Sequence, residues 1–176
     1  IGAAYAEYVT EPGFEPGVAL VDAGANTVMM RTFSKIHGLA GLRVGWGYFP
    51  APVAGIVNRM RNPNNVTAIG IAVAAAAIAD RSHIATTRAA NAGLRARFID
   101  DLRRIGLAPC ESQANFVLLP FASAEQAASA RTFLKDRGIL IRPMTAYGLD
   151  QCLRITLGTP EEMRAVTEAF RLWKTQ

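Results

Sequence analysis

The stretch "MMRTFSKIHGLAGLRVGWGYFP", residues 29–50, decides the fold, because it sets a lysine and a glycine-rich run between two strand-like segments. Residues 27–33 and 42–49 read as strands, with the glycines forming a loop between them. Backbone amides of such a loop form a common cradle for an anion, and Arg43 would add a bidentate guanidinium. Lys35 is then either a Schiff-base nucleophile or an ordinary exposed charge, and local chemistry favours neither reading.

Two other glycine motifs fit this stretch poorly. A dinucleotide fingerprint should open a helix, whereas "GLAGLRVGWG" precedes a predicted strand. The run also lacks the Lys-Ser/Thr ending of a P-loop. The hydroxyls of Thr32 and Ser34 suit a phosphate cradle better.

Composition excludes several classes of protein. The chain has 176 residues, half of them apolar, which is enough for a real core. Its net charge of +5 reflects 16 arginines and three lysines, scattered along the sequence, against 14 acidic residues. Nucleic-acid binding usually needs a clustered basic stripe, so we expect small anionic partners and no nucleic acid.

The sequence also argues against a membrane, a disulfide framework and a metal site. The apolar run Ile69–Ala79 is too short and too rich in alanine to span a bilayer, and no signal peptide opens the chain. We therefore expect a cytoplasmic protein without a membrane partner. Cys110 and Cys152 lack disulfide or zinc spacing, so we expect buried free thiols and no metal.

Periodicity predicts an α/β unit followed by a smaller α+β unit. Residues 1–8 resemble the end of a buried strand that runs into a loop, and residues 9–25 resemble a loop with a short helical turn. The further expected helices are 52–60, 64–80, 81–105, 123–136 and 160–174, and the further expected strands are 115–121, 139–143 and 152–158. The helix at 64–80 is apolar nearly all round, which predicts that it is buried.

Helix ends are marked in the sequence. Gly106 is placed to end the long helix, and Ser123 with Gln126 predicts a capping box. Thr159 with Glu162 predicts a second box, followed by proline at the first helical position. The predicted domains are residues 1–80 and 81–176.

The lysine segment resembles that of fold-type I pyridoxal-phosphate aminotransferases. Their pattern is Ser/Thr-x-Ser-Lys, a glycine-rich spacer and Arg-x-Gly, as in "RTFSKIHGLAGLRVGWG". "AAYAEYV", "NPNNVT" and "SQANFVLL" resemble further segments of this superfamily. "ILIRPMTAYGLDQCLRITLGTPEEM" resembles the closing motif of the histidinol-phosphate aminotransferases. The resemblance covers residues 2 to about 172 and implies the large domain's C-terminal part in αβα layers, plus the small α+β domain.

The resemblance implies a role for each matching residue of the lysine segment. Lys35 would be the Schiff-base lysine and would move the proton between substrate and cofactor. Thr32, Ser34 and Arg43 would bind the phosphate of pyridoxal phosphate. Tyr5 would donate a hydrogen bond to the ring oxygen, although its spacing alone fits a half-buried strand aromatic.

Further matching residues would bind the substrates, an amino donor and a 2-oxo acid. Arg154 would hold the anionic end of the substrate, Arg142 on the preceding strand would complete the clamp, and Asn115 would contact substrate. Without the resemblance, Arg154 reads as the polar face of a strand. His37 and His83 have no partners at catalytic spacing and are expected to be structural or exposed.

The sequence departs from the family pattern at one place that bears on chemistry. Gly2 stands where the family has the aspartate that pairs with the pyridine nitrogen, and Ala3 where it usually has glutamate. That carboxylate keeps the ring an electron sink. The resemblance further implies a C-terminal half only, so we expect a homodimer from a complete chain and poor stability or aggregation from this one.

Three functional interpretations remain open from the sequence. The first is transamination of histidinol phosphate with 2-oxoglutarate in histidine biosynthesis. The second, on the same scaffold, is an aromatic aminotransferase or a threonine-phosphate decarboxylase. The third is a catalytically silent, truncated remnant.

Overall fold

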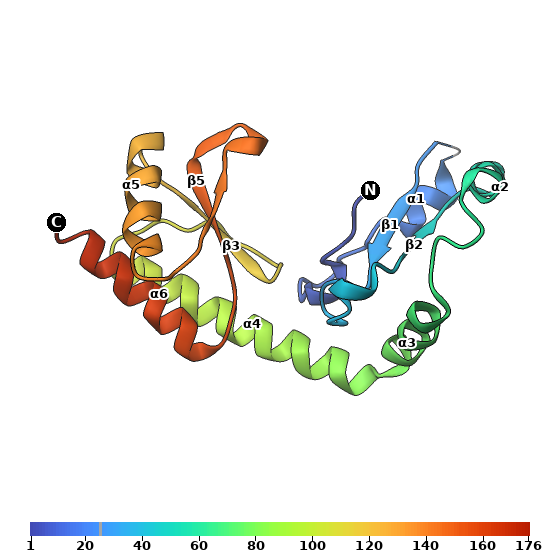
Figure 1. Ribbon diagram of the computed structural model, residues 1–176, viewed down its shortest axis with the longest axis horizontal. Helices are drawn as coiled ribbons and strands as arrows, with labels where there is room; N and C mark the ends of the chain where they lie inside the picture. The colour runs from blue at the N-terminus through green and yellow to red at the C-terminus, as the bar shows by residue number, and fades with distance from the viewer. Residues whose placement is uncertain (25) are drawn as a thin grey trace. The chain divides into compact units, whose positions relative to one another are not determined.

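Two antiparallel strands, β1 (Met29–Thr32) and β2 (Gly45–Tyr48), form the centre of the first part of the chain (Figure 1). The computed structural model describes residues 1–24 and 26–176. Thr32 lies opposite Gly45, so the chain reverses direction between them through the glycine-rich segment. Both strands lie where the sequence predicted them, each shorter than expected.

The first eight residues add less to this sheet than the sequence predicted. Gly2 forms an isolated parallel bridge to Met30, in which the Ala3 amide donates to the Met30 carbonyl at 2.9 Å. The chain then enters a 3-10 turn, Ala6–Tyr8. The predicted burial of this segment is wrong at its start, because Ile1 lies outside the two-stranded sheet and is exposed.

The helices of the first part of the chain follow one another in the sequence order that the periodicity predicted. They are α1 (Val18–Ala23), α2 (Ala51–Met60), α3 (Ala68–Ala79) and α4 (Arg81–Arg104). The described chain divides into two compact units, Ile1–Ala89 and Ala90–Gln176, so α4 contributes to both. The predicted domain boundary between residues 80 and 81 coincides with the start of α4 and stays a prediction.

Helix α3 corrects the prediction that it is buried. Gly70 and Ala74 are its buried residues, whereas Ile69 and Ile71 are 69% and 60% exposed. Ala74 packs in a small cluster with Phe33 and Val44, which covers one narrow side of the helix. A helix that is apolar all round has no polar face to mark its exposed side, so the sequence could not reveal this.

No single helix among residues 1–24 and 26–176 is long and apolar enough to cross a membrane. Helices α3 and α4 pass that test only together, as a sharply bent pair, by length and composition.

The second unit contains a sheet in the antiparallel order β3-β5-β4, built from β3 (Phe116–Pro120), β5 (Leu149–Thr156) and β4 (Arg142–Met144). Helices α5 (Ala124–Lys135) and α6 (Pro160–Trp173) pack with the sheet and the end of α4 around one core (Figure 1). The largest fully buried side chains of this core are Phe98, Leu102, Val117, Leu119, Leu134, Leu153 and Phe170.

Strand β4 begins three residues later than the predicted strand 139–143. The Ile139 amide donates to the Leu134 carbonyl at 3.0 Å, and the Gly138 amide donates to the Lys135 carbonyl at 2.9 Å. Gly138 has a φ of +77°, so these bonds form a Schellman cap at the end of α5. Ile139 is therefore used to end a helix and is not available to start the strand.

The predicted helix caps are mostly confirmed. Thr159 and Glu162 form the full capping box, in which the Thr159 amide donates to the Glu162 carboxylate at 2.6 Å. Ser123 accepts from the Gln126 amide, but the Gln126 side chain accepts from the Ala122 amide, so the second predicted box is only half formed.

Gly106 ends α4 as the sequence predicted. It has a φ of +72°, and its amide donates to the Arg103 carbonyl at 2.9 Å. The Leu107 amide donates to the Leu102 carbonyl at 3.0 Å, which completes a Schellman cap. The left-handed φ explains why glycine occupies this position.

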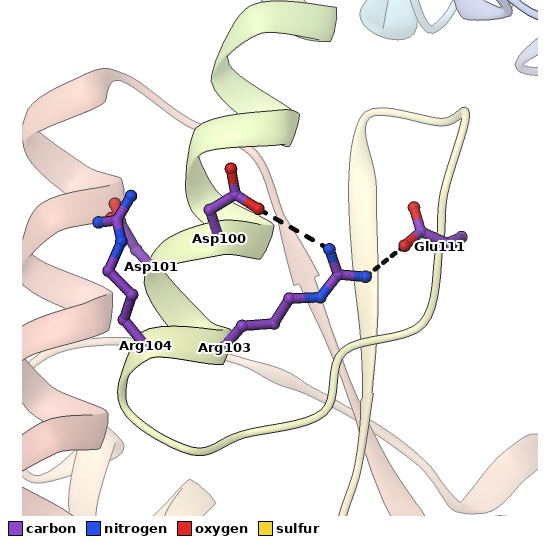
Figure 2. Close-up of polar contacts among 5 residues, drawn as sticks. All are labelled: Asp100, Asp101, Arg103, Arg104 and Glu111. Atoms are coloured by element: carbon purple, nitrogen blue, oxygen red, sulfur yellow. Dashed lines mark hydrogen bonds and ion pairs between the residues drawn. The ribbon is translucent and has the colours of Figure 1, made fainter.

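Arg103 joins the last turn of α4 to the loop that precedes β3 (Figure 2). Its guanidinium lies 3.7 Å from the Asp100 carboxylate and forms an ion pair with Glu111. Arg104 pairs with Asp101 beside it. These groups are largely exposed, so the pairs contribute little to stability.

The cysteines differ from their prediction. Both are free, as expected, and Cys152 is buried on β5, but Cys110 is exposed. Its amide donates to the Leu118 carbonyl at 2.9 Å, outside the main core. A thiol at a loop position gives no sequence signal of its exposure, because its neighbours follow no strand or helix period.

Candidate functional site

Lys35 lies in the tight turn that follows β1. The Phe33 amide donates to the Val44 carbonyl at 3.1 Å, and the Gly38 amide donates to the Lys35 carbonyl at 2.9 Å. Phe33 and Ile36 are both buried. Two buried anchors on either side of Lys35 therefore fix its backbone, while its own side chain is only half-buried.

The structure brings Lys35 and Tyr5 together, although 30 positions in the sequence separate them. The Lys35 Nζ atom lies over the Tyr5 ring, 5.2 Å from the ring centre. An ammonium group at this distance from an aromatic face is attracted by its quadrupole. An amine and a phenol therefore share one location in the first unit.

Hydroxyl and guanidinium groups stand near Lys35 in the chain. Thr32 Oγ1 accepts a hydrogen bond from the Ser34 amide at 3.0 Å, which orders the start of the turn. Arg43 has a φ of +53°, a left-handed conformation that is uncommon for a residue with a side chain. Its Nη1 donates to the Ala40 carbonyl at 2.8 Å, and the side chain is exposed.

The positive φ of Arg43 is a local strain that points toward function. Backbone strain of this kind costs about 1–3 kcal/mol and concentrates at binding sites. Glycine would remove the strain at this position, yet the sequence has an arginine. The anion-binding roles predicted for Thr32, Ser34 and Arg43 are consistent with this geometry and stay predictions.

The two histidines occupy structural positions. His83 Nε2 lies 2.9 Å from the Ile36 carbonyl and so joins α4 to the lysine turn. The His37 ring lies 4.9 Å from the Phe33 ring, centre to centre. His37 Nδ1 is buried and has no hydrogen-bond partner among the described residues.

Gly2 lies beside β1, where the family pattern predicts an aspartate. Its bridge to Met30 fixes its backbone, and a Cβ atom built on it would meet no other atom within 4 Å. A side chain would therefore fit here. Glycine is not required at this position by space or by a positive φ.

An ion pair that the sequence did not predict holds the segment after Tyr5. Glu7 Oε1 accepts from Arg31 Nη2 at 2.6 Å and from Arg31 Nε at 3.2 Å. Both side chains are largely buried. Arg88 Nε donates to the Glu7 carbonyl at 2.5 Å. Scattered arginines gave no signal for this network, since its members are far apart in sequence.

In the second unit, the structure brings together the two arginines predicted to bind substrate. Arg142 and Arg154 are register partners on β4 and β5, and both line one cavity of about 460 Å³. The Arg154 guanidinium lies 5.1 Å from the Phe116 ring centre. Arg154 Nε is buried and has no hydrogen-bond partner among the described residues. Such a group suits an anionic ligand.

Asn115 directly precedes β3, at the end of a turn whose carbonyls α4 binds. The Leu157 amide donates to the Asn115 carbonyl at 2.9 Å. Arg95 is buried, and its Nη1 donates to the Gln113 carbonyl at 3.2 Å and the Ala114 carbonyl at 3.3 Å. Burial lowers the pKa of Arg95. The sequence missed Arg95, which looked like one of many solvated arginines on α4.

Among residues 1–24 and 26–176, no group of three or more His, Cys, Asp or Glu side chains is arranged to hold a metal ion. The first unit instead offers one lysine, one phenol, two hydroxyls and the Arg43 guanidinium, and the second unit offers the paired Arg142 and Arg154. These groups suit an organic cofactor or a substrate with anionic ends.

Comparison with known proteins places the chain in a family. The model of the family "Aminotransferase class I and II" matches residues 2–170 of this chain. The histidinol-phosphate aminotransferase of Granulibacter bethesdensis is 45% identical over 176 residues, which are 100% of this chain and 48% of that protein. The histidinol-phosphate aminotransferase of Rhodospirillum centenum is 48% identical over 174 residues, 98% of this chain and 48% of that protein.

A solved structure agrees with these sequence matches. The histidinol-phosphate aminotransferase of Sinorhizobium meliloti, in complex with pyridoxal-5'-phosphate, superposes with a TM-score of 0.87 at 31% identity. The alignment covers 98% of this chain and 47% of that one. The predicted fold class, part of a fold-type I aminotransferase, is thereby confirmed. The chain spans about half the length of the relatives it matches, and it belongs to the aminotransferase class I and II family.

Proposed function

We propose that this chain carries the lysine-bearing part of a pyridoxal-phosphate-dependent aminotransferase that acts on histidinol phosphate and 2-oxoglutarate in histidine biosynthesis. The observation that supports it best is the Lys35 amine, held 5.2 Å from the centre of the Tyr5 ring. The relatives named histidinol-phosphate aminotransferase support the choice of substrate.

The residues present fit the cofactor at most positions. Thr32, Ser34 and Arg43 supply two hydroxyls and a guanidinium for a phosphate group, and the exposed Arg43 side chain can reach a ligand. The Tyr5 phenol can donate to the ring oxygen. Gly2 is the exception, since it offers no carboxylate to the pyridine nitrogen. We infer weak retention of the cofactor as a consequence.

Pyridoxal phosphate, when bound, supplies an aldehyde that exchanges amines and a ring that accepts electrons from the substrate Cα. Lys35 contributes the amine that holds the cofactor and later carries the proton at Cα. Positioned proton transfer is worth about a hundred- to ten-thousandfold in rate. Lys35 therefore serves as both nucleophile and general base.

Arg154 and Arg142 would bind the anionic end of each substrate. Both the amino donor and the 2-oxo acid carry such a group, so one pair of guanidiniums serves both halves of the reaction. The cavity that both arginines line supports this role. Asn115 would contact substrate from the bend directly before β3. A cytoplasmic location and a homodimer of the complete chain are further proposals, supported by the family resemblance alone.

Covalent trapping tests the lysine assignment. The chain is incubated with pyridoxal phosphate, reduced with borohydride and digested, and the modified lysine is located by mass spectrometry. We expect modification at Lys35 and its loss in Lys35→Ala, with Lys135→Ala as a matched control on α5. Equal modification of Lys35, Lys135 and Lys174 would contradict a specific site.

Measuring the rate of amino transfer distinguishes the two candidate amino donors from each other and from a catalytically silent chain. Amino transfer to 2-oxoglutarate is followed with histidinol phosphate and, separately, with phenylalanine as donor. A preference for phenylalanine would overturn the proposed substrate. Specific labelling of Lys35 without transfer from either donor would support a silent remnant.

A further inference from the structure

The ion pair between Glu7 and Arg31 has no role in the function proposed above, and it is unusual in being largely buried. The two side chains are only 14% and 13% exposed, and they share two hydrogen bonds through Glu7 Oε1. Removing charges from water costs several kcal/mol per ion, so a buried pair is weak evidence for stability. The best-attested role of a buried ion pair is to fix one conformation of the chain.

Three independent contacts fix the 3-10 turn Ala6–Tyr8 that carries Glu7. Its side chain is bound by Arg31, its carbonyl accepts from Arg88 Nε at 2.5 Å, and the following Tyr8 ring is buried. Tyr5 is the residue immediately before this turn, and its carbonyl accepts from the Tyr8 amide at 3.0 Å. The position of Tyr5 therefore follows from the position of Glu7.

Arg31 belongs to the same strand as the lysine segment. It lies opposite Trp46 in the sheet, and its guanidinium lies 5.6 Å from the centre of the Trp46 ring. β1 ends at the next residue, Thr32, and Lys35 follows three positions later. The Glu7–Arg31 pair thus connects the turn that directly follows Tyr5 to the strand that leads into the Lys35 turn.

We propose that Glu7, Arg31 and Arg88 are positioning residues that hold the Tyr5 ring against the Lys35 amine. The inference rests on the proposed function only for the use of that contact. Without the pair, the segment before Ala6 keeps its backbone bonds to Met30 in β1, but the turn that follows Tyr5 loses its side-chain bond to Arg31 on the same strand. The ring and the amine then separate.

The first test measures the contact without any cofactor. NOE cross-peaks between tyrosine ring and lysine side-chain protons are recorded on the 176-residue chain, and Tyr5→Phe and Lys35→Ala assign the peak. We expect the Tyr5–Lys35 peak to be lost in Arg31→Ala and weakened in Arg88→Ala. Arg31→Lys, which keeps a charge near Glu7, should restore part of it.

The second test measures the chemical consequence. The rate of covalent trapping of pyridoxal phosphate at Lys35 should fall by roughly ten- to a hundredfold in Arg31→Ala, since small displacements of a reacting group carry penalties of this order. Arg31→Lys should recover part of the rate. Arg164→Ala, which removes an exposed ion pair with Glu161 in the second unit, is the control and should leave both readouts unchanged.

The outcomes separate the two proposals. If the wild-type chain does not react at Lys35 but the Tyr5–Lys35 peak still depends on Arg31, the positioning role stands and the proposed function fails. If Arg31→Ala does not fold by circular dichroism, Glu7→Gln, which keeps the size of the side chain and removes its charge, replaces it. Folded Glu7→Gln or Arg31→Ala that keeps the wild-type peak and trapping rate would overturn the inference.

Discussion

Arg142 and Arg154 lie directly opposite each other on the antiparallel strands β4 and β5. Like charges at directly opposite positions of a sheet destabilise it. The Arg142 guanidinium lies 5.7 Å from the Tyr147 ring centre, and the Arg154 guanidinium lies near Phe116, so aromatic faces offset part of this repulsion. A dianionic ligand would offset more of it.

We therefore expect 2-oxoglutarate or inorganic phosphate to raise the melting temperature of the chain more than sodium chloride does at equal ionic strength. Arg154→Gln should abolish this difference, because it removes the guanidinium whose Nε is buried without a partner among the described residues. Differential scanning fluorimetry measures the effect. Arg171→Gln on α6, which breaks an exposed pair with Glu168, is the matched control. An undiminished anion effect in Arg154→Gln would contradict the assignment.

Gly2→Asp should increase the affinity for pyridoxal phosphate. A Cβ at this position meets nothing within 4 Å, so the new side chain fits without strain. A charge-assisted hydrogen bond to the ring nitrogen is worth about 1.5–3 kcal/mol, which corresponds to roughly tenfold or more in Kd. Fluorescence titration with the cofactor checks this. Ala3→Asp adds the same charge one residue away and should give a smaller gain; equal gains would point to a non-specific charge effect.

Tyr8 should make the folded chain sensitive to alkali. Burial raises the pKa of Tyr8 above its ordinary value of 10.0, and the charge of Glu7 raises it further. The folded state then holds the phenol proton more tightly than the unfolded state, so stability from this group is complete below pH 10 and falls as pH rises through the folded pKa. Urea unfolding as a function of pH should show a smaller alkaline loss for Tyr8→Phe. Tyr147→Phe, at an exposed position, should behave like wild type.

The exposed side of α3 should cause self-association. Ile69, Ile71 and Ile78 are large apolar side chains in contact with solvent, and exposed apolar patches of this kind favour association. Ile69→Lys with Ile71→Lys should reduce the apparent mass of the chain in light scattering at the same protein concentration. Ala75→Lys adds a charge to an exposed position of the same helix without removing an isoleucine. A chain that is already monomeric before substitution would show this prediction to be wrong.

The sequence predicted the order and type of most elements, because their signals are local. In the sequence, Thr159, Glu162 and the adjacent proline mark the start of α6, and Gly106 marks the end of α4. The structure confirms both, and Gly106 has the left-handed φ that glycine adopts most readily. The prediction of strand bounds failed where one residue could belong either to a strand or to the cap of the preceding helix. Ile139 looks like the start of a strand, yet its amide closes the cap of α5.

The sequence by itself determined the family, the lysine turn and the residues proposed to bind the cofactor, since motif spacing is a property of the chain alone. Only the tertiary structure decided which distant groups meet. It placed Tyr5 over Lys35, paired Glu7 with Arg31 and set Arg142 opposite Arg154. It also showed that α3 is exposed along most of its surface. Burial and long-range contacts depend on which surfaces the rest of the chain covers, and no local pattern of residues encodes that.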